Sequence, residues 1–344
     1  MYRQVKKFKD IGGYFYVEGL IYDIKEGENE DKGKRYFQEL SLKGEVLWQS
    51  EESNVYSYHV NQEVIIFNLK TAEETAEDIL IYDRKTKKLI AKTKIKLFLY
   101  IDECFEGNIL YNIDDNNVIV FDILEGKVLS EKNTSIKGIT AFLTDEYIVN
   151  YSNTYTYIYV YKKNDFSLLW QQNIQDFFPG EEDLSILEIY SYKDTFIIIA
   201  RVGIVCLSQK DGSLIWKCDH YARTMEIVGH YGYVCTSLSF YRVDLDTGEK
   251  YGYGRKYDRL PDFEYNGKNH WPSGHRVVYH KGLLWYDVHT SKHPFIIAID
   301  PETGNYQWIH EITSSNQYIE NIKFYDDKMF VTDTDYNLFI YEEE

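Results

Sequence analysis

The amino-acid sequence predicts an all-β fold, a single β-propeller domain that spans residues 1–344. Three observations lead to this prediction. A short motif, in which a strand ends in Asp, a turn with Thr and Gly follows and a second strand reaches Trp, recurs along the chain. The copies are spaced by roughly 40 residues, a period typical of propeller blades. Each period holds about four short runs of β-branched and aromatic residues, which suit half-buried strands.

The motif is clearest between Asp300 and Trp308, where Thr303 and Gly304 form the turn. The other positions at which a copy closes are Trp48, Ala91, Ser130, Trp170, Trp216 and Gly252. Because Trp recurs in step with the repeat, we expect it on the outer strand of a blade, packed against the neighbouring blade.

The strands of the third unit are predicted at 97–100, 109–113, 118–121 and 127–129. Those of the fifth unit are predicted at 186–190, 195–200, 203–207 and 213–216. Gly, Asp and Asn stand between these runs, because tight hairpin turns need residues that tolerate the left-handed backbone conformation. We find no run with helical spacing of apolar residues.

Beyond Trp308 the chain supplies three more strands, at 318–324, 329–332 and 338–341, and no fourth. The N-terminal strand at 2–8 can complete this last blade, which would remove two exposed sheet edges. The alternative pairs residues 2–8 with the first blade as its inner strand. We count eight blades, with seven as the alternative.

The composition limits the classes of partner and compartment. The formal net charge of −17 argues against nucleic acid, which is bound largely through Lys and Arg, and against an anionic membrane surface. We see no signal peptide and no membrane-spanning run. Four scattered cysteines predict a reducing, cytoplasmic location. Cys206 and Cys218 fall on the two arms of one predicted hairpin, and we expect two buried thiols there rather than a disulfide.

Strand geometry sorts the loops onto two faces of the propeller. Loops between the second and third strands of a blade share one face with the blade-to-blade connections, and the Thr-Gly turns lie on the other. We call these the long-loop face and the turn face. The longest connections predicted on the long-loop face are 23–34, 71–78, 173–185, 253–275 and 289–294. Long loops on a rigid scaffold usually carry the function.

Three of these loops are acidic, and their candidate partner-binding residues are Glu28, Glu30, Glu74, Glu77, Glu181 and Glu182. One acidic loop alone is a solvated loop, but three on one face favour electrostatic steering of a cationic partner. The loop at 253–275 differs, and its candidate residues are Arg255, Tyr257, Arg259, Phe263, Tyr265, His270 and Trp271. Aromatic residues with Arg are typical of interface hot spots. The alternative is a loop that packs these aromatic side chains over the ring.

Five histidines lie between positions 270 and 293: His270, His275, His280, His289 and His293. With Asp258 or Asp262 they are candidates for a metal site. Their spacing matches no metal-binding motif, so we favour scattered surface imidazoles and assign no metal. The sequence also lacks a nucleophile elbow and a phosphate-binding Gly-rich loop, and we assign neither catalytic residues nor a cofactor.

The Asp-x-x-Thr-Gly-x-x-x-Trp motif at 300–308, with echoes at 208–216 and 40–48, resembles the repeats of the pyrroloquinoline-quinone-type propeller family. The resemblance covers nearly the whole chain and implies the propeller fold. The family includes quinone-dependent dehydrogenases, marked by an adjacent Cys-Cys pair, and assembly scaffolds. Cys104, Cys206, Cys218 and Cys235 are not adjacent, so the resemblance implies a non-enzymatic member.

These observations predict a monomeric, non-enzymatic binding scaffold that engages a basic protein partner with its long-loop face. One concrete form is an inhibitor or immunity-type protein that neutralises a cationic toxin or nuclease. The alternative is a small-ligand binder or an enzyme that uses the mouth of the central channel, with the loop at 253–275 as a lid.

Overall fold

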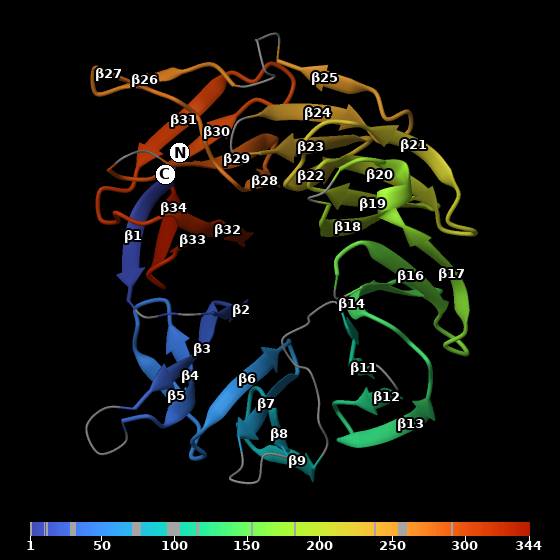
Figure 1. The fold of residues 1–344 in the computed structure, drawn as a ribbon. Coiled ribbons are helices and arrows are strands. Elements are labelled where there is room, and N and C mark those ends of the chain that lie inside the picture. Colours follow the sequence, from blue (N-terminus) through green and yellow to red (C-terminus); the bar gives the residue numbers. More distant parts are fainter. Residues whose placement is uncertain are drawn as a thin grey trace.

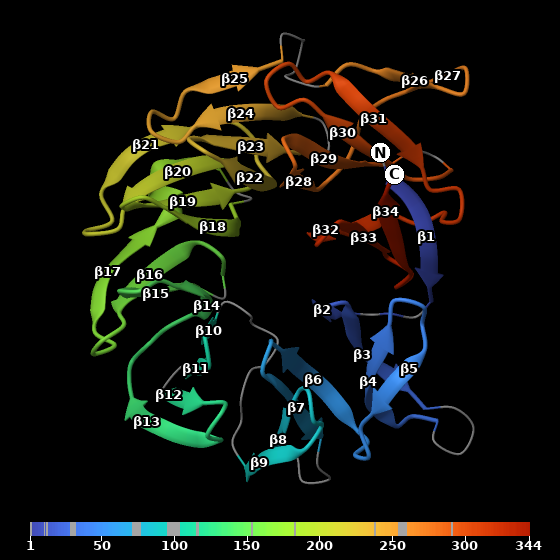
Figure 2. The same cartoon turned by 180° about the vertical axis from the view of Figure 1, so that it is seen from behind.

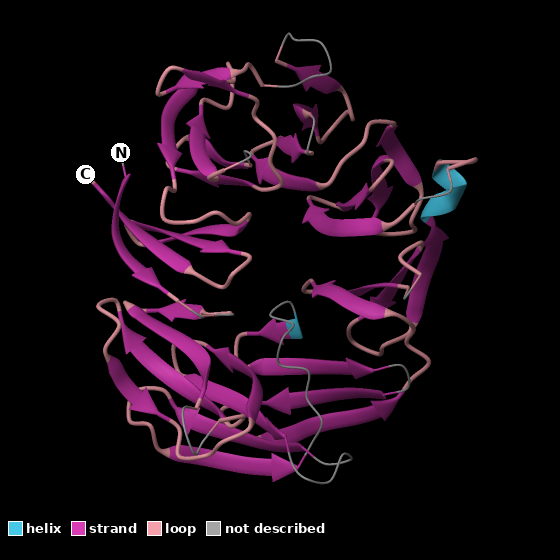
Figure 3. Cartoon of the chain, turned by 60° about the vertical axis from the view of Figure 1, so that its left-hand side comes forward, coloured by secondary structure: helices cyan, strands magenta, loops and turns pink. Residues whose placement is uncertain are grey.

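The computed structural model describes residues 2–9, 11, 13–27, 32–70, 77–94, 104–114, 117–152, 154–181, 184–236, 239–253, 260–289 and 292–344, with only the backbone of Glu77 and Asp114. Eight four-stranded antiparallel sheets surround a central channel, and a two-stranded hairpin accompanies them (Figures 1 and 2). The prediction of an all-β propeller with eight blades is confirmed. The chain is built from strands apart from short turns such as the 3-10 helix Ile174–Phe177 (Figure 3).

Each of the first seven blades takes its four strands from one continuous stretch, in order from the channel outwards. Blades 1 to 4 consist of β2 (Phe15–Val17), β3 (Leu20–Glu26), β4 (Arg35–Ser41) and β5 (Val46–Gln49); β6 (Val55–Val60), β7 (Val64–Lys70), β8 (Glu77–Asp83) and β9 (Leu89–Lys94); β10 (Phe105–Glu106), β11 (Ile109–Asp114), β12 (Asn117–Asp122) and β13 (Lys127–Asn133); β14 (Ile139–Leu143), β15 (Tyr147–Tyr151), β16 (Tyr157–Lys162) and β17 (Leu168–Asn173).

Blades 5 to 7 consist of β18 (Ile186–Tyr192), β19 (Thr195–Ala200), β20 (Gly203–Ser208) and β21 (Leu214–Cys218); β22 (Thr224–Val228), β23 (Tyr231–Cys235), β24 (Phe240–Asp244) and β25 (Lys250–Gly252); β28 (Val277–His280), β29 (Leu283–Val288), β30 (Phe295–Ile299) and β31 (Tyr306–Glu311). The hairpin of β26 (Phe263–Tyr265) and β27 (Lys268–His270) is inserted between blades 6 and 7. The strand predicted at 97–100 lies outside the described residues, and the inner strand described in blade 3 is β10.

Blade 8 joins the two ends of the chain. It consists of β32 (Ile319–Tyr325), β33 (Lys328–Asp333), β34 (Leu338–Glu343) and, on the outside, β1 (Tyr2–Phe8). β1 runs antiparallel to β34, from Tyr2 opposite Glu343 to Phe8 opposite Leu338. The alternative, in which this segment is the inner strand of blade 1, is wrong. Tyr2 is buried and its ring meets the Trp285 ring edge-on at 5.2 Å, so the closing strand is held by the core of the last two blades.

The tryptophans that close the repeat lie on outer strands, as predicted. Trp216 of blade 5 packs on the turn of blade 6, where its indole N–H donates to the carbonyl of Leu245 at 3.0 Å. A Cβ on Gly248 in that turn would lie 2.7 Å from the Trp216 ring, and this glycine has a φ of +77°. Glycine is therefore required twice, for the left-handed turn and for the close approach of the indole.

Two blades make the same joint without Trp. Tyr253 follows the short outer strand of blade 6, lies against Gly304 and donates its hydroxyl to Pro301 O at 2.8 Å. In blade 8 the joint belongs to Lys6, whose ammonium donates to Lys43 O at 2.7 Å beside Gly44. In these two blades a long side chain with a donor takes the place of the indole, whereas in blade 2 the closing residue Ala91 lies directly against Gly126 of the next turn.

Candidate functional site

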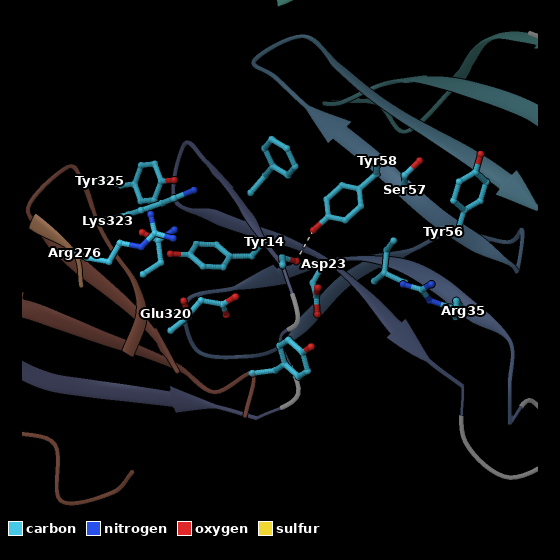
Figure 4. Close-up of a pocket in the computed structure, with 16 residues that line it drawn as sticks. Tyr14, Asp23, Arg35, Tyr56, Ser57, Tyr58, Arg276, Glu320, Lys323 and Tyr325 are labelled. Atoms are coloured by element: carbon cyan, nitrogen blue, oxygen red, sulfur yellow. Dashed lines mark hydrogen bonds between the residues drawn. The ribbon is translucent and has the colours of Figure 1, made fainter. Parts of the chain in front are cut away.

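The strand order places the second-to-third loops and the blade-to-blade connections on one face of the ring, and a cavity opens on this long-loop face. The cavity has a volume of about 790 Å³ and lies at the channel mouth between blades 8, 1 and 2, with one residue from blade 7 (Figure 4). Its walls come from the inner strands β2, β6 and β32, along β32 from Glu320 to its last residue Tyr325, and from β3, β4 and β33. We call it the mouth cavity.

Three cationic side chains reach the mouth cavity from three blades: Arg35 from blade 1, Arg276 from the entry to blade 7 and Lys323 from blade 8. All three are exposed, and none forms an ion pair with another residue in the part of the chain that the structure describes. In Figure 4, Arg276 and Lys323 stand on one side of the cavity and Arg35 on the other. The mouth of a strongly acidic protein is thus lined by unpaired positive charge.

Tyrosines supply much of the remaining wall, with Tyr14, Tyr56, Tyr58 and Tyr325 among them. The Tyr58 hydroxyl is held between two carbonyl oxygens that share its one proton, Gly13 O at 2.6 Å and Tyr22 O at 2.9 Å. Tyr14 differs, because its phenol forms no side-chain hydrogen bond with another described residue although burial raises its pKa. Tyr14 therefore offers an unused hydrogen-bond donor to the cavity.

Asp23 lies between the two groups of cations in Figure 4, and its side chain is 3% exposed. Burial raises the pKa of Asp23 to about 7, because a carboxylate loses its hydration there; the nearby charge of Arg35 opposes the rise weakly. This carboxyl is partly neutral at physiological pH. The charge of the mouth cavity therefore becomes more positive as the pH falls through 7.

The position of Arg276 is fixed from beneath by Asp287, which is fully buried in β29. One carboxylate oxygen accepts the backbone N–H groups of His275 at 2.9 Å and Arg276 at 2.5 Å. The other oxygen lies 2.6 Å from the Nε2 atom of His289. Gly274 passes so close to the Asp287 carbonyl that a Cβ there would be 1.6 Å from its oxygen. The segment that carries Arg276 to the mouth is thus pinned to blade 7.

The second cavity, of about 560 Å³, lies between blades 4 and 5 and has a different wall. Ile139, Ile186, Leu187 and Tyr155 make it largely apolar. Its acidic group, Glu188, is already bonded to the next blade: it accepts the Thr224 hydroxyl at 3.0 Å and the Met225 N–H at 3.3 Å. This cavity holds no comparable free charge.

The acidic loops predicted to bind a partner lie mostly outside the described residues. These are Glu28, Glu30, Glu74 and Glu182; of Glu77 the structure describes only the backbone, in β8. Glu181 is described and exposed, at the end of the connection between blades 4 and 5. The prediction that these carboxylates bind a partner stays a prediction.

The loop at 253–275 is divided by the structure. Arg255, Tyr257 and Arg259 lie outside the described residues. Phe263 is buried, its ring lies 5.5 Å from both Phe295 and Tyr306, and Tyr265 and His270 pack edge-on or tilted against Phe295. These three side chains are packed within the protein, as the alternative expects, but against blade 7 and not over the ring. Trp271 remains half exposed, at 52%.

The described hairpin of this loop does not lie over the channel mouth, where a lid would be. β26 and β27 lie beside the outer strand β31 on the flank of blade 7, away from the channel mouth (Figures 1 and 2). The described part of the loop therefore covers the outer joint between blades 6 and 7. The sequence carries a signal for this hairpin: an Asn-Gly pair between aromatic residues is a strong hairpin signal, and Asn266 and Gly267 both have positive φ.

The five histidines do not come together, and the described residues contain no group of three or more potential metal ligands. His270 stacks on Phe263 and His280 on Phe324, while the Nδ1 atom of His293 lies 2.8 Å from Ser315 O. Only His275 and His289 are neighbours, with ring centroids 5.2 Å apart. Most of these side chains pack within blades, so the description as scattered surface imidazoles is too simple.

Sequence reasoning missed the residues that line the mouth cavity: Tyr14, Asp23, Arg35, Arg276 and Lys323. They stand singly in the sequence, and all except Asp23 lie outside the predicted long loops. The four cysteines, for comparison, are buried and form no disulfide, and burial raises the pKa of Cys206 and of Cys218 to about 11.

Comparisons with known proteins support the fold. No protein-family model and no curated protein matches the sequence. Similar solved structures include BamB from Moraxella catarrhalis (9% identity, TM-score 0.63, 100% of each chain covered) and the C-terminal WD40 domain of Sif2 (9%, 0.63, 100% and 99%). Sqt1 from Saccharomyces cerevisiae is also similar (8%, 0.64, 99% and 98%). Within the described part of the chain, no helix has the length and apolarity to cross a membrane. The chain is a β-propeller, and its membership of the quinone-type repeat family stays a prediction.

Proposed function

We propose that this protein is a non-enzymatic scaffold that binds a protein partner with its long-loop face. The observation that carries the proposal is the composition of the mouth cavity, where Arg35 and Arg276 stand among tyrosines at the centre of that face. Tyr and Arg are enriched where binding energy concentrates in protein interfaces, because both combine a large contact area with hydrogen bonding. A rigid ring of sheets holds these residues in place before a partner arrives, which lowers the entropy cost of association.

The partner is proposed to be basic where it meets the acidic loops that the sequence predicts on the long-loop face. The support is the sequence: the net charge is −17, and three loops of the same face are rich in Glu. Opposite charges at the rim of an interface raise the association rate and suppress wrong partners, an effect that salt screens.

The test is to capture partners from the native cell lysate with three proteins: wild type, a loop variant with Glu28→Lys, Glu74→Lys and Glu182→Lys, and a matched variant of the turn face. The matched variant carries Glu45→Lys, Glu125→Lys and Glu249→Lys, which change the charge equally at exposed turns. We expect a stoichiometric basic protein that the loop variant loses and the turn variant keeps. The purified partner is then titrated at rising salt. An interaction that salt does not weaken, or that both variants lose equally, would count against the proposal.

A second candidate function is the binding of a small molecule in the mouth cavity. Its volume of about 790 Å³ falls in the range of ligand pockets, roughly 300 to 1,000 Å³. A screen of small molecules by thermal shift, with Arg276→Gln as the control for the site, tests this function. Stabilisation of the wild type alone would support it, and equal shifts in both proteins would not.

A further inference from the structure

We infer that the mouth cavity receives an acidic segment of the protein partner, a run of Asp or Glu side chains that pairs with Arg35, Arg276 and Lys323. This inference rests on the proposed function and refines it, because it names the chemistry of the part of the partner that enters the centre of the face. The partner would then be basic around the rim and acidic at its centre.

The first support is local charge. The described lining of the mouth cavity holds three cations against two carboxyls, Asp23 and Glu320, in a protein with 38 basic and 55 acidic residues. The acidic excess of the whole chain is thus reversed at this place. Guanidinium groups bind carboxylates through paired N–H donors, which makes arginine a specific receptor for acidic side chains.

The second support is that these groups have no structural task in the described protein. Neither Arg35, Arg276 nor Lys323 has an ion-pair partner there. Elsewhere in the ring such cations are used: Arg242 reaches Glu302 at 2.6 Å and Lys193 reaches Asp246 at 2.5 Å, each joining two blades. The cations that join two blades are paired across the joint. Arg35, Arg276 and Lys323 line the mouth cavity and have no ion-pair partner among the described residues.

The third support is the neutral part of the wall. The phenol of Tyr14 is an unused donor, and Asn321 and Ser57 add polar groups at the same level. Asp23 is buried and partly protonated near neutral pH, so it repels an acidic segment less than an ionised carboxylate would. A volume of about 790 Å³ accommodates several side chains of an extended peptide, so a segment fits better than a single carboxylate.

The experiment is calorimetric titration of the purified full chain with three octapeptides in which Ser alternates with Glu, Gln or Lys. Citrate is titrated separately as a free polycarboxylate. The proteins are the wild type, a mouth variant with Arg276→Gln and Lys323→Gln, and a control with Lys85→Gln and Lys210→Gln. The control residues are exposed lysines on turns of the opposite face, so both double variants change the net charge equally.

We expect the Glu peptide to bind the wild type and the control alike, and the mouth variant about tenfold more weakly or beyond detection. The affinity falls as salt rises and increases as the pH falls from 8 to 6, because Asp23 becomes neutral. If the mouth variant does not fold, as judged by its thermal unfolding, Arg35→Gln alone replaces it.

Three results would overturn the inference: no binding of the Glu peptide, equal binding of the Gln or Lys peptide, or equal loss in both double variants. Binding of citrate without binding of the Glu peptide would also overturn it and leave a small-anion site. The proposed function survives any of these failures, because its own test depends on the acidic loops and a captured partner.

Discussion

Blades 5 and 8 build the same stretch of inner strand in two ways. In blade 5, Glu188 follows a β-bulge and stands opposite Ile199, and Tyr190 lies two residues on. In blade 8, the positions in the same register belong to Asn321, opposite Thr332, and Lys323. Glu188 accepts hydrogen bonds from the first strand of blade 6, and the hydroxyl of Tyr190 donates to Met225 O at 2.7 Å. Asn321 and Lys323 make no side-chain hydrogen bond with the described part of blade 1.

The same two positions of the repeat therefore have different roles in blades 5 and 8. Where a carboxylate and a phenol fill these positions, they tie the blade to its neighbour. Where an amide and an ammonium fill them, the joint depends on other contacts: the Tyr16 hydroxyl donates to Asp326 at 2.6 Å, the Tyr16 ring lies 4.9 Å from the rings of Tyr325 and Phe330, and Lys6 bonds the next turn on the outside. Asn321 and Lys323 then make no bond with the described residues of blade 1, and we propose that they are available to a partner.

The largest loss of stability is expected from Trp216→Ala, because Trp216 closes the outer joint of blade 5 and is 8% exposed. Loss of its packing and of the bond to Leu245 O lowers the free energy of unfolding by about 3–5 kcal/mol. Urea denaturation measures the change. The control is Ile215→Ala on the same strand, whose side chain is 51% exposed and which should cost about 0.5 kcal/mol or less. Equal effects of both substitutions would contradict the assigned register.

The next effect concerns Asp23 and depends on pH. Its pKa is raised from 3.8 to about 7 in the folded protein, so folding takes up a proton between these values. The stability that the neutral carboxyl provides is complete below pH 4 and is lost as the pH rises to 7, by about 4 kcal/mol at most. Asp23→Asn removes this loss. We expect the variant to be more stable than the wild type above pH 7, with a difference that shrinks towards pH 4 in urea denaturation; a difference independent of pH would contradict the burial of a titrating group.

A smaller effect on stability distinguishes the inner strand of blade 5 from that of blade 8. Glu188→Gln weakens bonds to Thr224 and Met225 and is expected to lower the free energy of unfolding by about 1–3 kcal/mol. Asn321→Ala, at the corresponding position of blade 8, removes no such bond and should change it by about 0.5 kcal/mol or less. Thermal unfolding followed by calorimetry compares the two. A larger cost at Asn321 would reverse the distinction between a closed and an open joint.

The smallest effect on stability is expected from Trp271→Ala, because the Trp271 side chain is half exposed. The unfolding temperature should stay within about 2 °C of the wild type. Phe263→Ala in the same loop is the matched comparison and should cost about 3 kcal/mol or more, since Phe263 is buried against blade 7. If both residues proved equally dispensable, the hairpin would not be part of the joint between blades 6 and 7.

The sequence predicts the ring far better than it predicts the site, for a physical reason. The joints repeat, so Trp216 and Gly248 recur with their neighbours and reveal the period, the blade count and the two faces. The mouth cavity arises where the pattern is broken, and Lys323 is informative only after its strand is aligned with that of Tyr190. The inner strands start without a marker and contain bulges, so this register cannot be read from spacing. The hairpin at 263–270 can be predicted from the sequence, because Asn266-Gly267 marks its turn.

The most direct test of a binding site at the mouth cavity is hydrogen–deuterium exchange of the full chain with and without a saturating concentration of the Glu-Ser octapeptide. We predict slower exchange in the inner strands β2, β6 and β32 around the mouth cavity. We predict no change in β18 and β22, where Glu188 is already bonded to Thr224 and Met225. Protection confined to blades 5 and 6 or to the turn face, or none at all, would contradict the claim that the free charges of blades 8, 1 and 7 form the binding site.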